Sequence, residues 1–142
     1  MKAIERVLAL AFIAAVCLNF ANVVGRYGFG RSIAGGDEVQ VYIMVWMAFL
    51  GAVLVSWRQD HLRMDVIAQR LPEGVRNILK RTELALVVAL AGFALWQSLS
   101  YTQQMIAIGR RSDNAGIPMW IPHGAVAVGF ALILLIAVFK KR

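Results

Sequence analysis

The stretch VQVYIMVWMAFLGAVLVSW, residues 39–57, contains no charged side chain. A helix of this length measures about 28 Å, which nearly matches the ~30 Å hydrocarbon core of a bilayer. Asp37 and Glu38 precede the stretch, where Asp37 can serve as N-cap and Glu38 as a favourable first-turn anion, and Arg58 follows it. The stretch therefore predicts a membrane-spanning helix.

Three further runs without Asp, Glu, Lys or Arg occupy residues 7–25, 84–109 and 122–139. The first run is longer than the apolar region of a signal peptide, about 7–15 residues, so we expect a retained anchor. Proline is tolerated in the first turn of a helix, so Pro122 is the expected start of the fourth span. The two prolines should break any regular helix across residues 116–122.

The composition agrees with a protein whose main solvent is lipid. Hydrophobic residues make up 60% of the chain, charged residues 16%, and the mean hydropathy is +0.67. Soluble domains have roughly 45–50% apolar residues. Cys17, the single cysteine, excludes a disulfide within the chain. We therefore predict an all-α membrane protein with one four-span domain over residues 1–142.

The distribution of basic residues predicts the orientation. With a cytoplasmic N-terminus, eleven Lys and Arg residues lie inside and four lie outside, at Arg26, Arg31, Arg110 and Arg111. This excess is the positive-inside signal, so both termini and the segment between the second and third spans should be cytoplasmic. A basic face with interleaved aromatic residues is missing, which excludes nucleic-acid binding as an explanation of the net charge of +7.

The segment of residues 59–82 shows helical spacing of apolar residues on both sides of Pro72. Val75, Ile78 and Leu79 repeat at this spacing, with basic residues on the opposite face. We expect an amphipathic interfacial helix here, with its second part continuous with the third span.

Several function classes lack the residues that they need. The four spans carry no ionisable residue in their middle, whereas ion-coupled transporters usually place one there. His61 and His123 belong to opposite membrane sides and cannot share a haem. The sequence has no catalytic triad, zinc motif or phosphate loop, so we expect neither an enzyme nor a metal site.

The remaining candidates are polar residues at helical spacing. Those of the first two spans are Asn19, Asn22 and Arg26, and then Glu38, Tyr42, Trp46 and Phe49. Arg26 and Glu38 lie at a similar depth, which suggests that they pair; helix capping and snorkelling are the alternative. In the third span Gln97, Ser100, Tyr101 and Gln104 share a face, which should contact a helix of this or another chain. Pro118 and Trp120 should belong to a rigid turn at the interface.

Short motifs occur in a fixed order along the chain. They are Arg26-Tyr27-x-Phe29, Glu38, Trp46-x-x-Phe49-Leu50-Gly51-Ala52, His61-x-x-x-Asp65 and Ile117-Pro118-x-Trp120. Together with the four spans and the length, these motifs make the chain resemble the small membrane subunit of tripartite ATP-independent periplasmic (TRAP) transporters. The resemblance covers nearly the whole chain. Gly35-Gly36 departs from the pattern, because a tryptophan is expected there in many relatives.

The resemblance implies a function in partnership, in a bacterial inner membrane. A periplasmic binding protein would capture an organic acid, and a large sodium-coupled elevator subunit would transport it. This chain would scaffold the large subunit within the lipid and bind no cofactor, with sodium bound by its partner. The matching residues Arg26, Tyr27, Glu38, His61, Asp65, Pro118 and Trp120 would serve interfaces or architecture, and none would be catalytic. His61 and Asp65 could bond each other or be solvated. The alternative is a self-sufficient, homo-oligomeric transporter or channel.

Overall fold

The computed structural model describes residues 2–58 and 72–139, which form four helices. These are α1 (Lys2–Gly28), α2 (Gly36–Arg58), α4 (Glu73–Ile108) and α5 (Trp120–Phe139). All four are long and apolar enough to cross a membrane. In the described ranges the extended structure is limited to one isolated bridge between Arg111 and Pro118. The prediction of an all-α chain with four spans is confirmed.

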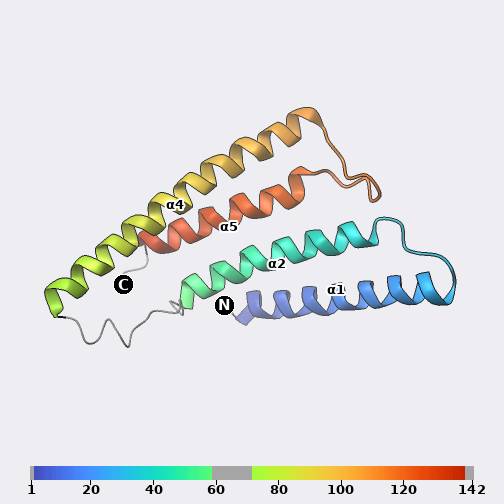
Figure 1. Cartoon of the computed structure of the whole chain (residues 1–142), viewed down its shortest axis with the longest axis horizontal. Coiled ribbons are helices and arrows are strands. Elements are labelled where there is room, and N and C mark those ends of the chain that lie inside the picture. Colours follow the sequence, from blue (N-terminus) through green and yellow to red (C-terminus); the bar gives the residue numbers. More distant parts are fainter. Residues whose placement is uncertain (1, 59–71, 140–142) are drawn as a thin grey trace.

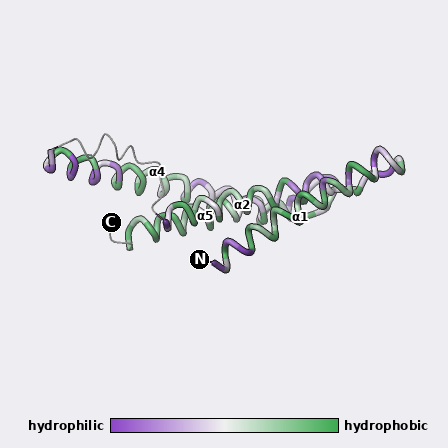
Figure 2. Tube along the Cα trace, turned by 90° about the horizontal axis from the view of Figure 1, so that it is seen from below, coloured by the Kyte–Doolittle hydropathy of each residue, from purple (hydrophilic) through white to green (hydrophobic). Residues whose placement is uncertain are grey.

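The helices form a flat layer and not a closed bundle. They lie side by side in the order α4, α5, α2, α1, with contacts between each neighbouring pair (Figure 1). Turned by 90°, the same helices overlap in one thin band (Figure 2). Because a layer of this kind has two open faces, most apolar side chains remain exposed.

Helices α2 and α5 pack closely in the middle of the layer. A Cβ atom at Gly129 would lie 2.8 Å from Phe49, so the two helices approach as closely as a glycine allows. The rings of Phe49 and Phe130 meet edge to face at 5.6 Å. The buried apolar residues of the described chain are few and mostly small: Ala15, Val53, Ala91, Met105, Ala125 and Ala127.

Helix α4 is longer than any expected span. Residues 73–82, which the sequence assigned to the interfacial segment, form the first turns of this 36-residue helix. The helix ends at Gly109, whose φ of 66° is left-handed and whose N–H bonds to the carbonyl of Ile106. Residues 59–71 lie outside the described ranges, and with them His61 and Asp65.

Helix α5 begins at Trp120, two residues before the expected start at Pro122. The sequence predicts no regular helix across residues 116–122, and this is wrong for residues 120–122, which are helical. Pro122 lies in the first turn, where the backbone N–H has no partner in the helix, so its ring removes no bond.

The layer has two ends, at which different parts of the chain lie. The first residues of α1 and the last residues of α5 lie toward one end of the layer, and the segments 29–35 and 109–119 lie at the other (Figure 1). We refer to residues 29–35 and 109–119 together as the loop end.

Candidate functional site

Asn22 joins α1 to the start of α2 at the loop end. Its side chain is only 5% exposed. The amide Nδ2 donates to Asp37 Oδ1 at 2.7 Å, and the amide oxygen accepts the backbone N–H of Ile33 at 2.9 Å. Both polar ends of this buried amide are thus satisfied, which fixes the turn between the two helices.

Arg26, one turn further along α1, pairs with the same carboxylate. Its guanidinium lies 3.3 Å from Asp37 Oδ2, and both side chains are more than half exposed. The hypothesis that Arg26 pairs with Glu38 is therefore wrong, because the neighbouring acidic residue takes that place. Asp37 is also within the helix, which starts at Gly36, and it does not act as the expected N-cap.

Glu38 instead connects α2 to the other loop. Its carboxylate accepts the backbone N–H of Ala115 at 2.8 Å and that of Asn114 at 3.1 Å, and also the Asn114 side-chain amide at 3.2 Å. This one side chain therefore joins α2 to residues that lie 76 and 77 positions further along the chain. Bonds from N–H groups to a charged carboxylate are stronger than those between neutral groups.

The loop of residues 109–119 folds back on itself as a short hairpin. The Ser112 N–H donates to the Ile117 carbonyl at 2.8 Å, and the Met119 N–H donates to the Arg110 carbonyl at 3.0 Å. The buried Ser112 hydroxyl accepts the N–H of Ile117 at 3.1 Å. These hydrogen bonds give the hairpin a defined conformation, so its exposed residues form a defined surface.

Tyr42 and Pro118 belong to the same end of the layer. The Tyr42 hydroxyl donates to the sulfur of Met119 at 3.2 Å, which attaches the hairpin to α2. Pro118 forms the bridge with Arg111. Trp120, directly after, is 45% exposed at the start of α5. Glu38, Tyr42 and Pro118 are thus brought together, as parts of the hairpin's attachment.

The two loops touch at Gly35. Its φ is +74°, and an added Cβ would lie 2.6 Å from the Cα of Ala115. No side chain fits at this position in the present arrangement. The glycines that replace the tryptophan expected from the resemblance are therefore part of how this chain closes its loop end.

The other sequence candidates lie apart from the loop-end contacts. Tyr27 is 83% exposed, and Gln97 and Gln104 are exposed on α4. Tyr101 is also exposed, although its ring meets that of His123 at 4.7 Å, across the α4–α5 contact. Residues 2–58 and 72–139 contain no cluster of three His, Cys, Asp or Glu side chains that could hold a metal.

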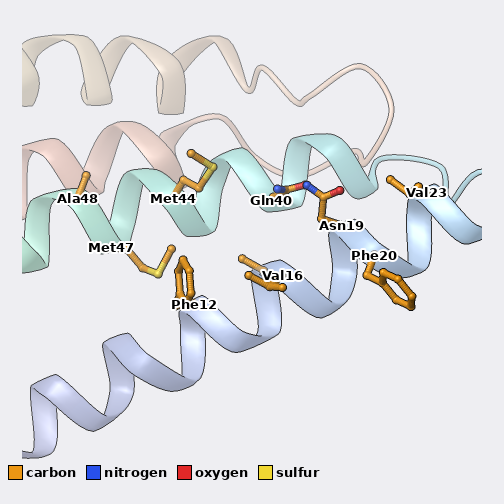
Figure 3. A pocket seen from close by; sticks show the side chains of 10 residues that line it. Phe12, Val16, Asn19, Phe20, Val23, Gln40, Met44, Met47 and Ala48 are labelled. Atoms are coloured by element: carbon orange, nitrogen blue, oxygen red, sulfur yellow. The ribbon is translucent and has the colours of Figure 1, made fainter.

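Asn19 and Trp46 line two different grooves: the first lies between α1 and α2, and the second is also lined by Ile117 and Ile121. The groove with Asn19 has a volume of about 680 Å³ and also contains Gln40 (Figure 3). The groove with the half-buried Trp46 has a volume of about 430 Å³ and no polar lining surface. We refer to the first as the amide groove.

Sequence reasoning missed several residues of these sites. The sequence predicts only a capping role for Asp37, and Ser112 and Asn114 lie in a short polar loop whose pattern predicts no contact. Gln40 was missed because it is a single polar residue in an apolar run. A signal was present for Gln40, since an amide in a span is costly unless it has a partner.

Comparisons with known proteins give a consistent result. Residues 15–140 match the family described as the DctQ component of tripartite ATP-independent periplasmic transporters. A protein of Haemophilus influenzae named as a TRAP transporter small permease is 31% identical, over 98% of this chain and 85% of its own. The C4-dicarboxylate TRAP transporter small permease protein DctQ of Vibrio cholerae is 27% identical, over 92% of this chain and 66% of its own.

A third relative is much longer. The isethionate TRAP transporter permease protein DctMQ of Oleidesulfovibrio alaskensis is 27% identical over 68% of this chain, and the match covers 15% of that protein. In this relative a region similar to our chain is therefore part of a larger permease polypeptide.

Proposed function

This chain belongs to the DctQ family of TRAP transporters, and we propose that it is the small membrane subunit that scaffolds a larger, sodium-coupled transport subunit. Family membership makes it a transporter component and not an enzyme. The scaffolding role, the coupling ion and the substrate are the parts that we propose.

The flat layer is the observation that carries the scaffolding role. In the four spanning windows only 6–22% of the residues are buried within the chain. A layer one helix thick encloses no space between its helices in which a solute could be surrounded by protein on all sides. It does offer two broad faces against which another membrane protein can pack.

The distribution of charge supports assigning transport chemistry to a partner. Ion-coupled transporters usually place an ionisable residue within the membrane, and the four spans carry none in their middle. We therefore place the sodium and substrate sites on the large subunit. The longer DctMQ relative supports a partner of this kind, because there the two parts share one chain.

The substrate is proposed to be an organic acid, delivered by a soluble binding protein on the periplasmic side. The names of two relatives include C4-dicarboxylate and isethionate, both organic acids. The excess of Lys and Arg at the opposite end supports a periplasmic loop end and cytoplasmic termini. The exposed hairpin of residues 110–119 would then face the binding protein.

The test is sodium-driven uptake in proteoliposomes. A large TRAP membrane subunit and a binding protein are reconstituted with this chain and without it, using C4-dicarboxylates and isethionate as labelled substrates. We expect uptake only when all three proteins and a sodium gradient are present. Uptake by this chain alone would contradict the proposal and favour a self-sufficient homo-oligomer.

A further inference from the structure

The amide groove runs along one side of the contact between α1 and α2. Its walls include Phe12, Val16 and Asn19 from α1 and Gln40, Met44 and Met47 from α2 (Figure 3). On α1 the lining extends from Phe12 to Val23, a length of about 16 Å or three helical turns. The lining includes no charged side chain.

Two amides distinguish this groove from a simple lipid-facing surface. Asn19 is exposed and Gln40 is half-buried, and their side chains point toward each other across one end of the groove (Figure 3). Neither side chain has a hydrogen-bond partner within residues 2–58 and 72–139. In hydrocarbon an unpaired amide is unfavourable, and an acyl chain offers neither donor nor acceptor.

Contacts beyond both ends of the groove join α1 to α2. Beyond one end, Asp37 binds Asn22 and Arg26. Beyond the other, Glu5 of α1 pairs with Arg58 of α2. Because α1 and α2 are joined on both sides of the groove, a partner need not order these helices, which lowers the entropy cost of binding.

We propose that the amide groove receives one uncharged helix of the large membrane subunit, bearing a hydrogen-bonding side chain at the level of Asn19 and Gln40. The inference rests on the proposed function and adds the place of contact. A helix meets both requirements of the groove, since it supplies polar side chains for the amides and apolar ones for the rest. Met44 and Met47 are flexible and can adapt to its surface.

Photocrosslinking identifies the occupant directly. The photoreactive residue p-benzoylphenylalanine is introduced at Val16, inside the groove, and in a matched protein at Ile13. The two side chains are 51% and 57% exposed on the same helix, but Ile13 does not line the groove. After irradiation of the co-expressed complex in membranes, we expect an adduct with the large subunit at Val16 and little or none at Ile13.

The outcomes separate this inference from the proposed function. If the unsubstituted chain fails to co-purify with the large subunit, the proposed function falls and the inference with it. If the pair co-purifies but Val16 crosslinks to lipid, to a second copy of this chain, or no more than Ile13, the inference alone is wrong.

A double substitution, Asn19→Leu with Gln40→Leu, tests the role of the amides. Hydrogen bonds between membrane helices have modest strength, so losing two should weaken the complex by about tenfold. The affinity of the purified subunits is measured in detergent, and the Tm of the double variant alone controls for folding. Unchanged affinity would show that the amides are not recognised by the partner.

Discussion

The positive φ of Gly35 and its closeness to Ala115 make this residue the point at which both loops depend on the absence of a side chain. Gly30, in the same loop segment, has a similar φ of +66° but open space around it. The two positions therefore separate the cost of the left-handed backbone from the cost of a close contact.

We predict that Gly35→Ala destabilises the protein more than Gly30→Ala does. Each alanine adds about 1–2 kcal/mol of left-handed strain, and only position 35 adds overpacking of about 1–3 kcal/mol. The Tm values of both variants in detergent measure the difference. Equal losses would show that the loops separate without cost.

Glu38, like Tyr42, attaches the hairpin to α2. Glu38→Ala should lower the Tm by a few degrees, because it leaves the N–H groups of Asn114 and Ala115 without their acceptor. Glu38→Gln retains one acceptor oxygen, so its Tm should lie between those of Glu38→Ala and the unsubstituted protein. The exposed Asp113 provides the control, since Asp113→Ala should change little.

At the scale of the helices, α5 joins α4 to the rest of the layer, because it contacts both α4 and α2. Small residues on α5 allow these contacts. Gly129 faces Phe49 at a distance that admits no Cβ, whereas Gly124 of the same helix has open space.

We predict opposite effects of alanine at these two glycines. Gly124→Ala should stabilise the protein by about 0.5–1 kcal/mol, because glycine is unfavourable inside a helix. Gly129→Ala should destabilise it by about 1–3 kcal/mol, since its methyl group forces α5 away from Phe49. Chemical unfolding in detergent compares the two. A stabilised Gly129→Ala would mean that the packing between α2 and α5 is looser than described.

The spans could be predicted from the sequence because each is a long run without charge. Their ends were less predictable, since Pro122 is compatible with several positions in a first turn. The partner of Arg26 was also not decidable, because Asp37 and Glu38 are adjacent and offer the same charge. The flat arrangement could not be predicted, since helices that are apolar on all sides do not reveal which side faces protein.

At the scale of the whole molecule, the loop end lies at one end of the layer, and the first residues of α1 and the last residues of α5 lie toward the other (Figure 1). Membrane orientation can therefore be read from two positions. After Cys17→Ser, single cysteines are introduced as Asp113→Cys at the loop end and Lys2→Cys at the start of α1.

We predict that an impermeant maleimide, admitted through a permeabilised outer membrane, labels the cysteine at position 113 in intact cells. The cysteine at position 2 should react only after the inner membrane is disrupted, because the excess of Lys and Arg predicts that this end is cytoplasmic. The opposite labelling pattern would reverse the orientation, and with it the assignment of the hairpin to the binding protein.

The unequal lengths of the helices affect how the layer fits bilayers of different thickness. Helix α5, with 20 residues, measures about 30 Å, and the adjacent α4, with 36 residues, measures about 54 Å. A thicker bilayer creates hydrophobic mismatch at α5 first, whereas α4 can still cover it by drawing its Glu73 end closer to the headgroups. Lipid thickness would thus act on the contact between α4 and α5, so acyl-chain length is a variable that reconstitution of this subunit has to control.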